Sequence, residues 1–401
     1  MKILVIHNFH RKGSASGDDQ VFKSETALME NNGHEVVRYT VTNDSFDNAG
    51  LWRKILSVFG MLWSISHYKA VKKILLEEKP DVVHIHTFFP LLSPSVLYAA
   101  KRCGSKVVTT LHDTRFICPC ATSLRDGKLC NACGDGRYFR MCKYGCFKNS
   151  RLQSFIVACI FKYHRAKKSF YNQIDRYICL NDNQIRLLVD TGFDEKKIIK
   201  KYNFVPDTNL KNLMEMPCLP ERYVVFYGRI GEEKGIRVLQ KLWESLAHIP
   251  LVVMGGGPLE GEFRAWAVHN KAVNYLGYTP HELCLNIVKN AEFVIFPSIV
   301  YEGCSMVQIE AESLGKGIIA TDLGFSSEAI QNGVNGYKVP LNDLDEFIKT
   351  ISMLWCDPDL CKLLGQNARL DYEKKYRPEN NYLQLKAIYE ELSQSRKKLE
   401  Q

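Results

Sequence analysis

Ten short apolar segments, each followed by a helix-like pattern, run along the chain in two sets of five and leave few folds open. The first set is Lys2 to His7, Glu35 to Thr40, Asp81 to His86, Lys106 to Leu111 and Asp175 to Leu180. The second set is Tyr223 to Tyr227, Leu251 to Met254, Val273 to Tyr275, Glu292 to Phe296 and Gly317 to Thr321. Strands that alternate with helices predict parallel sheets flanked by helices, so we expect an α/β protein with two such domains.

A polar, proline-bearing stretch at residues 200–207 lies between the two sets and suits a linker. We therefore predict a first domain over residues 1–207, a second over 208–380, and a last helical segment within 381–401. The length of 401 residues agrees, because a domain takes about 150 residues. A hydrophobic content of 46% and a charged content of 24% are typical of a soluble globular protein.

The location of the protein can also be predicted from the sequence. It holds no apolar run of the roughly 18 to 20 residues that a membrane-spanning helix needs. The chain begins directly with a predicted strand rather than with a signal peptide. We therefore expect a cytoplasmic protein, whose 14 cysteines are thiols or metal ligands rather than disulfides.

The segment from Glu302 to Glu310 lies between two of the predicted strands and carries a carboxylate at each end. Strand, glycine-containing turn, helix and strand form a βαβ unit, and ligands bind such units outside the carboxyl ends of the strands. Eight residues span about 12 Å along a helix. That separation exceeds the roughly 5 to 9.5 Å of a glycoside hydrolase carboxylate pair. It suits two parts of one long ligand, such as the sugar and the ribose of a nucleotide sugar.

This Glu-x7-Glu pattern resembles the signature of retaining glycosyltransferases of GT-B fold, especially glycosyltransferase family 4 of the bacterial surface-polysaccharide type. Further segments resemble that family in its own order, and together they cover nearly the whole chain. They are Met1 to His7, Gly33 to Val36, Tyr227 to Gly235, Val253 to Leu259, Val273 to Tyr278 and Pro297 to Ser298.

The resemblance implies two Rossmann-like parallel-sheet domains that face each other across a cleft. Residues 1–207 would form the acceptor side, with a cysteine-rich insert at about 114–150, and residues 208–380 the donor side. The segment 381–401 would cross back to the first domain. The donor would be a UDP- or GDP-linked sugar, and catalysis would need no metal cofactor.

Arg229 and Lys234 follow a predicted strand end and carry the cations that a departing diphosphate requires. In the family these positions do that work; the alternative is a pair of solvated loop cations. The family further implies that Glu302 accepts hydrogen bonds from the sugar and Glu310 from the ribose. For Glu310 the alternative is an exposed helical residue.

Backbone groups complete the expected donor site. A helix that begins near Ser305 would direct free amides at the ligand, and the family often has Phe-Gly where this chain has Cys304 and Ser305. The other glycines and amides of the site belong to neighbouring turns, where an ordinary turn is the alternative for Gly255 and Gly256. The expected set is Gly228, Gly255, Gly256, Gly303, Cys304, Ser305 and, from the first domain, Gly17.

His112 comes directly after an apolar strand and so lies at its carboxyl end. The matching histidine of the family lies near the reacting sugar, and the alternative is an ordinary loop histidine beside Asp113. His84 and His86 alternate along another strand and face the same side, and we expect core or strand-end packing for each.

Six cysteines gather in the insert that follows His112. The spacing Cys130-x-x-Cys133 and Cys142-x3-Cys146 is typical of a structural zinc site. Free thiols and disulfides are the alternatives, and the zinc content of purified protein distinguishes them.

A net charge of +9 calls for an anionic partner, but no nucleic-acid-binding motif is present. Leu51 to Leu76 and Arg151 to Phe170 interleave aromatic and basic residues, as helices in an anionic lipid interface do. The alternative is a core-packing helix with a solvated basic face. A peripheral enzyme on the inner face of the membrane, with a lipid-linked saccharide acceptor, would explain both segments.

The sequence therefore favours a retaining hexosyltransferase of cell-surface polysaccharide or lipopolysaccharide synthesis. A nucleotide-sugar 2-epimerase of the same fold and a non-catalytic sugar-nucleotide-binding protein stay open as alternatives.

Overall fold

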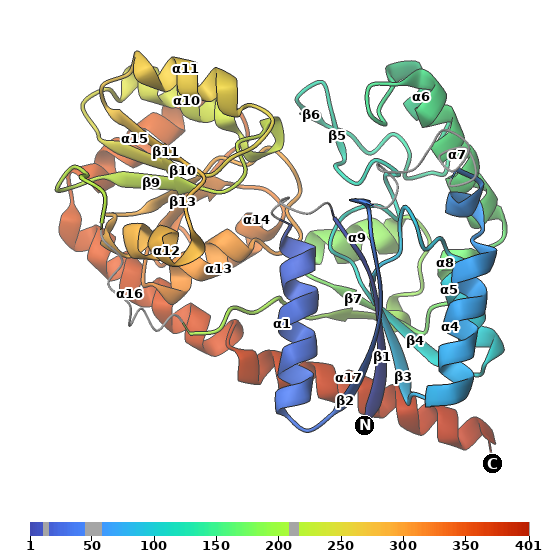
Figure 1. The fold of residues 1–401 in the computed structure, drawn as a ribbon. Coiled ribbons are helices and arrows are strands. Elements are labelled where there is room, and N and C mark those ends of the chain that lie inside the picture. The colour runs from blue at the N-terminus through green and yellow to red at the C-terminus, as the bar shows by residue number, and fades with distance from the viewer. Residues whose placement is uncertain (11–15, 45–57, 208–215, 401) are drawn as a thin grey trace. The chain divides into compact units, whose positions relative to one another are not determined.

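The computed structural model describes residues 1–10, 16–44, 58–207 and 216–400, with side chains up to residue 395. The chain forms two compact units (Figure 1). The first comprises Met1–Ser123, Cys130–Tyr202 and Asn381–Gln401, and the second comprises Leu124–Leu129 and Asn203–Asn380. The predicted boundary near residue 208 lies outside the described residues.

The first unit is built on a parallel sheet of order β2-β1-β3-β4-β7-β8. Its strands are β1 (Lys2–Phe9), β2 (Glu35–Thr42), β3 (Val82–Thr87), β4 (Lys106–Thr110), β7 (Arg176–Cys179) and β8 (Ile198–Lys200). Its helices are α1 (Gly17–Asn31), α4 (Ile65–Glu78), α5 (Ser95–Arg102), α7 (Arg151–Ala166), α8 (Ser169–Asn172), α9 (Asp182–Asp190) and, from the chain's end, α17 (Pro378–Glu400). The strand order reverses between β1 and β3, because the chain first adds β2 on one side of β1 and then β3 on the other.

Both faces of this sheet are buried, as parallel sheets require. Leu4 and Ile6 face a core made with α4, α5, α7 and α8. Ile3 and Val5 face a second core, to which α1 and the side chains of Leu385, Ile388, Tyr389 and Leu392 on α17 contribute. Figure 1 shows α1 and α4 on opposite sides of β1. The last helix is therefore part of the first unit, although it comes last in the sequence.

The second unit repeats the plan with a parallel sheet of order β11-β10-β9-β12-β13-β14. Its strands are β9 (Val224–Tyr227), β10 (Leu251–Met254), β11 (Val273–Gly277), β12 (Val294–Phe296), β13 (Ile318–Thr321) and β14 (Gly336–Val339). Its helices are α10 (Ile236–Ser245), α11 (Glu260–Val268), α12 (His281–Asn290), α13 (Met306–Ser313), α14 (Phe325–Ala329), α15 (Leu344–Trp355) and α16 (Pro358–Lys375). Helices α10, α11, α15 and α16 cover one face, and α12 and α13 cover the other. Here the order reverses between β9 and β12.

All ten predicted strands are present, and the prediction of two parallel α/β sheets is confirmed. Two short edge strands, β8 and β14, were not predicted. The insert between β4 and β7 also contains more structure than expected: a hairpin of β5 (Leu124–Arg125) and β6 (Lys128–Leu129), and helix α6 (Arg140–Tyr144).

The sequence left two interpretations of helix α7 open, a core-packing helix and a helix at a lipid surface, and the structure has features of both. Its inner face packs in the core, and this face includes Ile160 and Phe161, two of the residues expected at a lipid surface. Its outer face exposes Leu152 and Phe155, which are 70% and 51% accessible, and the ring of Phe155 lies 5.7 Å from that of Phe139 on the neighbouring segment. An exposed apolar surface therefore lies between basic residues.

The second segment expected at a membrane, Leu51 to Leu76, lies partly outside the described residues, which resume at residue 58. Within its described part, Phe59 and Ile65 are exposed, whereas Val71 and Leu75 of α4 are buried. In the part of the chain that the structure describes, no helix has both the length and the apolar character to span a bilayer.

Candidate active site

The predicted donor residues lie at the point where the strand order of the second unit reverses. Strands β9 and β12 are neighbours there, and the loops that follow them leave the sheet at the same edge because all strands are parallel. Open α/β sheets bind their ligands at such a point. Gly228, Arg229 and Lys234 belong to the loop after β9, and Glu302 belongs to the loop after β12.

A contact between Lys234 and Glu302 joins these two loops. The Nζ atom of Lys234 donates a hydrogen bond to Oε1 of Glu302 at 2.7 Å, and the Ser298 hydroxyl donates to the same oxygen at 2.8 Å. The ammonium group also lies 5.4 Å from the centre of the Phe296 ring. A basic and an acidic group, 68 residues apart in the sequence, are thus held together at the sheet edge.

Arg229 extends further from the sheet. Its side chain is 55% accessible, and its Nε atom lies 3.6 Å from Oε1 of Glu233. An exposed ion pair of this kind contributes little to stability, so the guanidinium can exchange its partner for a ligand phosphate at small cost. The alternative of a solvated loop cation therefore describes Arg229, whereas Lys234 is half-buried and paired.

Glycines allow the loops to approach one another closely. A Cβ atom on Gly255 would lie 1.8 Å from the carbonyl oxygen of Gly228, and both residues have positive φ angles, of 129° and 137°. Gly256 is less constrained, because a Cβ there would meet only the carboxylate of Glu260, at 3.1 Å. The close backbone approach that Gly255 permits is therefore one between two loops of the second unit.

Gly235 is the tightest position in the loop after β9, and it supports a stability prediction. It has a φ of 73°, and a Cβ atom would lie 1.8 Å from the Pro297 carbonyl oxygen. We expect Gly235→Ala to lower the free energy of unfolding by at least about 2 kcal/mol, because both strain and a backbone clash oppose it. Gly261, in α11, has nothing within 4 Å of its Cβ position. Gly261→Ala should leave stability unchanged or raise it by a few tenths, and denaturant titration of both variants compares them.

The loop after β12 leads into helix α13, and Ser305 is its N-cap. The hydroxyl oxygen of Ser305 accepts a long hydrogen bond from the amide of Gln308, at 3.4 Å. The helix therefore begins where the sequence predicted. Cys304 is buried, and its carbonyl oxygen accepts a hydrogen bond from the side chain of Asn203. Gly303 is buried beside it.

Glu302 lies in the loop, four residues before α13 begins, so the estimate of 12 Å along a helix does not describe its separation from Glu310. Its backbone carbonyl accepts a hydrogen bond from the amide of Phe325 at 3.1 Å. The backbone of Glu302 is therefore held by the first residue of α14 (Phe325–Ala329), which follows β13.

Glu310 is held on α13 by a histidine that the sequence analysis did not find. Its Oε1 atom lies 2.9 Å from Nε2 of His281, and the glutamate side chain is only 13% accessible. The hydrogen bond to Glu310 raises the pKa of His281 above its usual value, against the effect of burial. The alternative of an exposed helical glutamate is therefore wrong. No local signal in the sequence marks His281, which lies 29 residues away at the start of α12.

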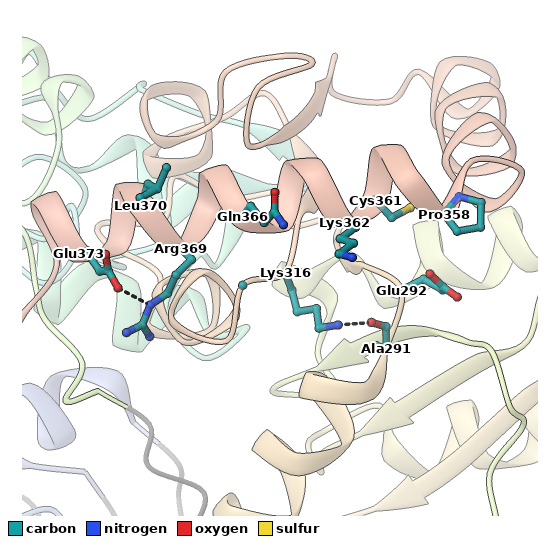
Figure 2. Close-up of a pocket in the computed structure, with 11 residues that line it drawn as sticks. Ala291, Glu292, Lys316, Pro358, Cys361, Lys362, Gln366, Arg369, Leu370 and Glu373 are labelled. Carbon is teal, nitrogen blue, oxygen red and sulfur yellow. Dashed lines mark hydrogen bonds and ion pairs between the residues drawn. The ribbon is translucent and has the colours of Figure 1, made fainter.

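A separate cleft of about 600 Å³ in the second unit contains none of the predicted residues (Figure 2). It is lined mainly by α16 and by the turn before β13. Two of its three cations are already paired: Arg369 contacts Asp207 and Glu373, and Lys316 donates to the carbonyl of Ala291. The cleft is therefore no argument against the site at β9 and β12.

In the first unit, His112 follows β4 and lies against a small cavity of about 40 Å³. Its Nε2 atom is 3.0 Å from Nδ1 of His86, at the end of β3. Gly17 is the first residue of α1, whose Asp19 lies 2.8 Å from Nε2 of His7. Burial lowers the pKa of His112, so the ring is neutral at physiological pH. The sequence interpretation of His84 and His86 as core residues holds for their burial, but their contacts are polar.

The cysteines of the insert are thiols without a disulfide. Burial and the neighbouring Cys118, Cys146 and Cys130 together raise the pKa of the Cys133 thiol to about 12. Burial also raises the pKa of the Cys142 thiol, and the cysteine that adds to this rise is Cys159 of α7. A zinc site made by Cys130, Cys133, Cys142 and Cys146 stays a prediction.

Among the described residues, a different group meets the distance requirement of a metal site. The ligand atoms of Glu25, His84 and His86 all lie within 4.8 Å of one another. All three residues are buried in the first unit.

Comparison with known proteins agrees with this architecture. Residues 26–208 match the family model described as Glycosyltransferase Family 4, and residues 219–371 match Glycosyl transferases group 1. An uncharacterized glycosyltransferase of Methanocaldococcus jannaschii is 24% identical over 336 residues, 83% of this chain and 82% of that protein. The O-antigen chain mannosyltransferase C of Escherichia coli is 26% identical over 160 residues, 39% of this chain and 43% of that protein.

A solved structure, HepE of Anabaena in complex with UDP-glucose, is 15% identical with a TM-score of 0.63, and the match covers 97% of this chain and 99% of that one. The two parallel α/β units thus define a protein of GT-B fold. The chain belongs to the glycosyltransferases of the family 4 type. It is a transferase, as the Glu-x7-Glu pattern predicted.

Proposed function

We propose that this protein transfers a hexose-type sugar from a nucleotide diphosphate sugar to a saccharide acceptor with retention of anomeric configuration. The observation that carries the proposal is the pair of Lys234 and Glu302, 2.7 Å apart between the loops after β9 and β12. An ammonium group there suits a diphosphate, and a carboxylate beside it suits sugar hydroxyls. The UDP-glucose complex of HepE supports a nucleotide sugar as the donor class.

Each group has a chemical task in the proposed reaction. The bond between the anomeric carbon and the diphosphate oxygen breaks, and negative charge develops on the leaving phosphate. Arg229, Lys234 and the amides of Gly303, Cys304 and Ser305 stabilise that charge. Glu302 orients the sugar, and Glu310 accepts hydrogen bonds from the ribose hydroxyls.

Retention follows if the acceptor hydroxyl attacks from the face that the diphosphate leaves. The acceptor oxygen then bonds to the anomeric carbon while its proton passes to the departing phosphate. His112 would contact the reacting sugar from the first unit. This scheme needs no metal cofactor.

Release of nucleoside diphosphate with and without an acceptor tests the proposal. A transferase releases it at a rate that rises with acceptor. A 2-epimerase converts the nucleotide sugar into its C2 epimer with no net release, and a binding protein leaves it unchanged. Thermal stabilisation by a panel of UDP- and GDP-sugars identifies the donor. A ligand at 100 times its dissociation constant adds about 2.7 kcal/mol to stability. Release that is unaffected by every saccharide acceptor tried would contradict the transferase assignment.

For the acceptor, the proposal is a lipid-linked saccharide at the cytoplasmic face of the membrane, in cell-surface polysaccharide synthesis. The similarity to an O-antigen mannosyltransferase supports this class of pathway. The outer face of α7 supports the location, because Leu152 and Phe155 are exposed there between Arg151 and Lys162. Exposed aromatic and aliphatic side chains among cations favour an anionic lipid interface.

The double variant Leu152→Ser/Phe155→Ser should weaken binding to anionic vesicles by tenfold or more, because each side chain loses about 1.5 to 3 kcal/mol of apolar burial. Vesicle flotation at moderate salt measures the binding. The matched control is Leu363→Ser/Leu383→Ser, which removes two leucines that are 50% and 62% accessible on other helices. Equal flotation of the two variants, or no flotation of the unmodified protein, would refute the proposal that this face of α7 binds the membrane.

A further inference from the structure

A chain of buried polar groups runs behind His112 in the first unit. Lys201 and Glu25, 1% and 2% accessible, form an ion pair through Nζ and Oε1. The second oxygen of Glu25, Oε2, lies 3.5 Å from Nε2 of His86. The other nitrogen of that ring, Nδ1, lies 3.0 Å from Nε2 of His112. The two rings are nearly coplanar, with 15° between their planes.

Each group in this chain determines which atom of the next group donates and which accepts. Burial raises the pKa of Glu25, but the adjacent Lys201 ammonium outweighs it and the net pKa is lowered, so the carboxylate is ionised. Burial lowers the pKa of both His86 and His112, so each ring is neutral and carries one proton. A carboxylate can only accept a hydrogen bond, and the proton of His86 is therefore favoured on Nε2.

With its proton on Nε2, His86 presents an unprotonated Nδ1 to His112. The short contact between the two rings then requires a proton on Nε2 of His112. We infer that Glu25, acting through His86, sets the tautomer of His112, so that Nε2 carries the proton and Nδ1 is left as a hydrogen-bond acceptor. Glu25 and His86 are thus positioning residues. In the proposed function, on which this last step rests, the acceptor nitrogen receives a sugar hydroxyl.

The chain also pairs two buried atoms for which the structure shows no hydrogen bond, Oε2 of Glu25 and Nε2 of His86, which lie 3.5 Å apart. A metal ion between them would be an alternative, with His84 as the third ligand. The Lys201 ammonium on the same carboxylate opposes a divalent cation. Both ring nitrogens of His84 are already engaged, with Tyr389 at 2.6 Å and Thr110 at 2.8 Å. The chain of polar contacts is therefore the better account.

Glu25→Gln tests the inference because it keeps the shape of the side chain but replaces one hydrogen-bond acceptor with a donor. Lys201 holds the amide oxygen of the glutamine, so its NH₂ group points at Nε2 of His86 and donates. His86 must then carry its proton on Nδ1, and His112 must carry its own on Nδ1. Both rings change tautomer. The control is Glu30→Gln on the same helix, where the carboxylate pairs with Arg38 at the surface.

Two-bond ¹H–¹⁵N spectra of the full-length protein, labelled with ¹⁵N-histidine, distinguish the tautomers, and His112→Gln assigns the signal. We expect the Nε2–H form in the unmodified protein and in Glu30→Gln, and the Nδ1–H form in Glu25→Gln. An Nδ1–H form in the unmodified protein, or an unchanged tautomer in folded Glu25→Gln, would overturn the inference. The first of these results does not depend on a change at Glu25. A metal retained by Glu30→Gln and lost by Glu25→Gln would also overturn it.

Because these spectra need no turnover, they separate this inference from the proposed function. In a transfer assay, Glu25→Gln should lower kcat/KM by about tenfold, the value of one hydrogen bond. In a His112→Gln background the same change should have no further effect, since the group through which it acts is gone. Equal losses in both backgrounds would mean that Glu25 has only a structural role.

Discussion

Lys234→Ala should lower the turnover of sugar transfer by about 100- to 1,000-fold while the protein keeps its fold. Removing one preorganised group that stabilises a developing anion typically has an effect of this size. The side chain is 24% accessible, and its ion pair with Glu302 contributes at most about 1 kcal/mol to folding after solvent screening. This variant should therefore lose most of its turnover while it keeps nearly all of its stability.

Lys241→Ala is the matched control, because this lysine is exposed on α10 of the same unit. Steady-state nucleoside diphosphate release measures turnover, and thermal unfolding verifies the fold. If Lys234→Ala transfers sugar at a near-normal rate, the ammonium does not act on the leaving group. A comparable loss in Lys241→Ala would instead indicate a general effect of removing charge from the unit.

The fold could be predicted from the sequence because parallel sheets give a strong local signal. Strand β1 contains the buried apolar run Ile3 to Ile6, strand β9 is apolar throughout, and both were found. Strand β8 has only three residues, of which Lys200 is exposed, and it pairs only with the edge of β7. Such a strand depends on its neighbour rather than on its own composition, so its sequence carries little signal.

The candidate site was predicted in part. Residues close together in the sequence could be predicted, whereas contacts between distant segments could not. Glycines and charges that share one loop, such as Gly228 and Arg229, form a pattern that can be read along the chain. The partners across loops cannot be read in this way. His281 meets Glu310, and Lys234 meets Glu302, only because the strand order brings β9, β12 and the start of α12 to one region.

The buried chain in the first unit was missed for the same reason. Glu25 lies on the inner side of α1, and its helical spacing marks it as a position that should be apolar. A charge at such a position is stable only with a partner, and Lys201 is 176 residues away. From the sequence, this lysine was predicted to lie in a polar linker. Its burial shows instead that the segment before residue 203 is part of the first unit's core.

Lys201→Met should destabilise the protein by about 3 to 5 kcal/mol, because it leaves the carboxylate of Glu25 buried without a counter-charge. Adjacent Lys200 is the matched control: its ion pair with Asp182 is at the surface, so Lys200→Met should lose less than about 1 kcal/mol. Denaturant titration measures both. Restoring neutrality with Glu25→Gln/Lys201→Met should recover part of the loss. Equal effects of the two lysine variants would exclude a buried ion pair.

The stability lost in Lys201→Met should increase as the pH rises from acid to neutral. In the unmodified protein the folded-state pKa of Glu25 is lowered, so the pair contributes stability above the unfolded pKa of about 4.5, and this contribution is lost as the pH falls. In Lys201→Met, burial without the ammonium raises the folded-state pKa, so the variant loses stability as the pH rises. The difference in unfolding free energy between the two proteins should therefore be smallest in acid and largest near neutral pH. A difference that stays constant from pH 4 to pH 7 would mean that the charge of Glu25 does not cause the loss.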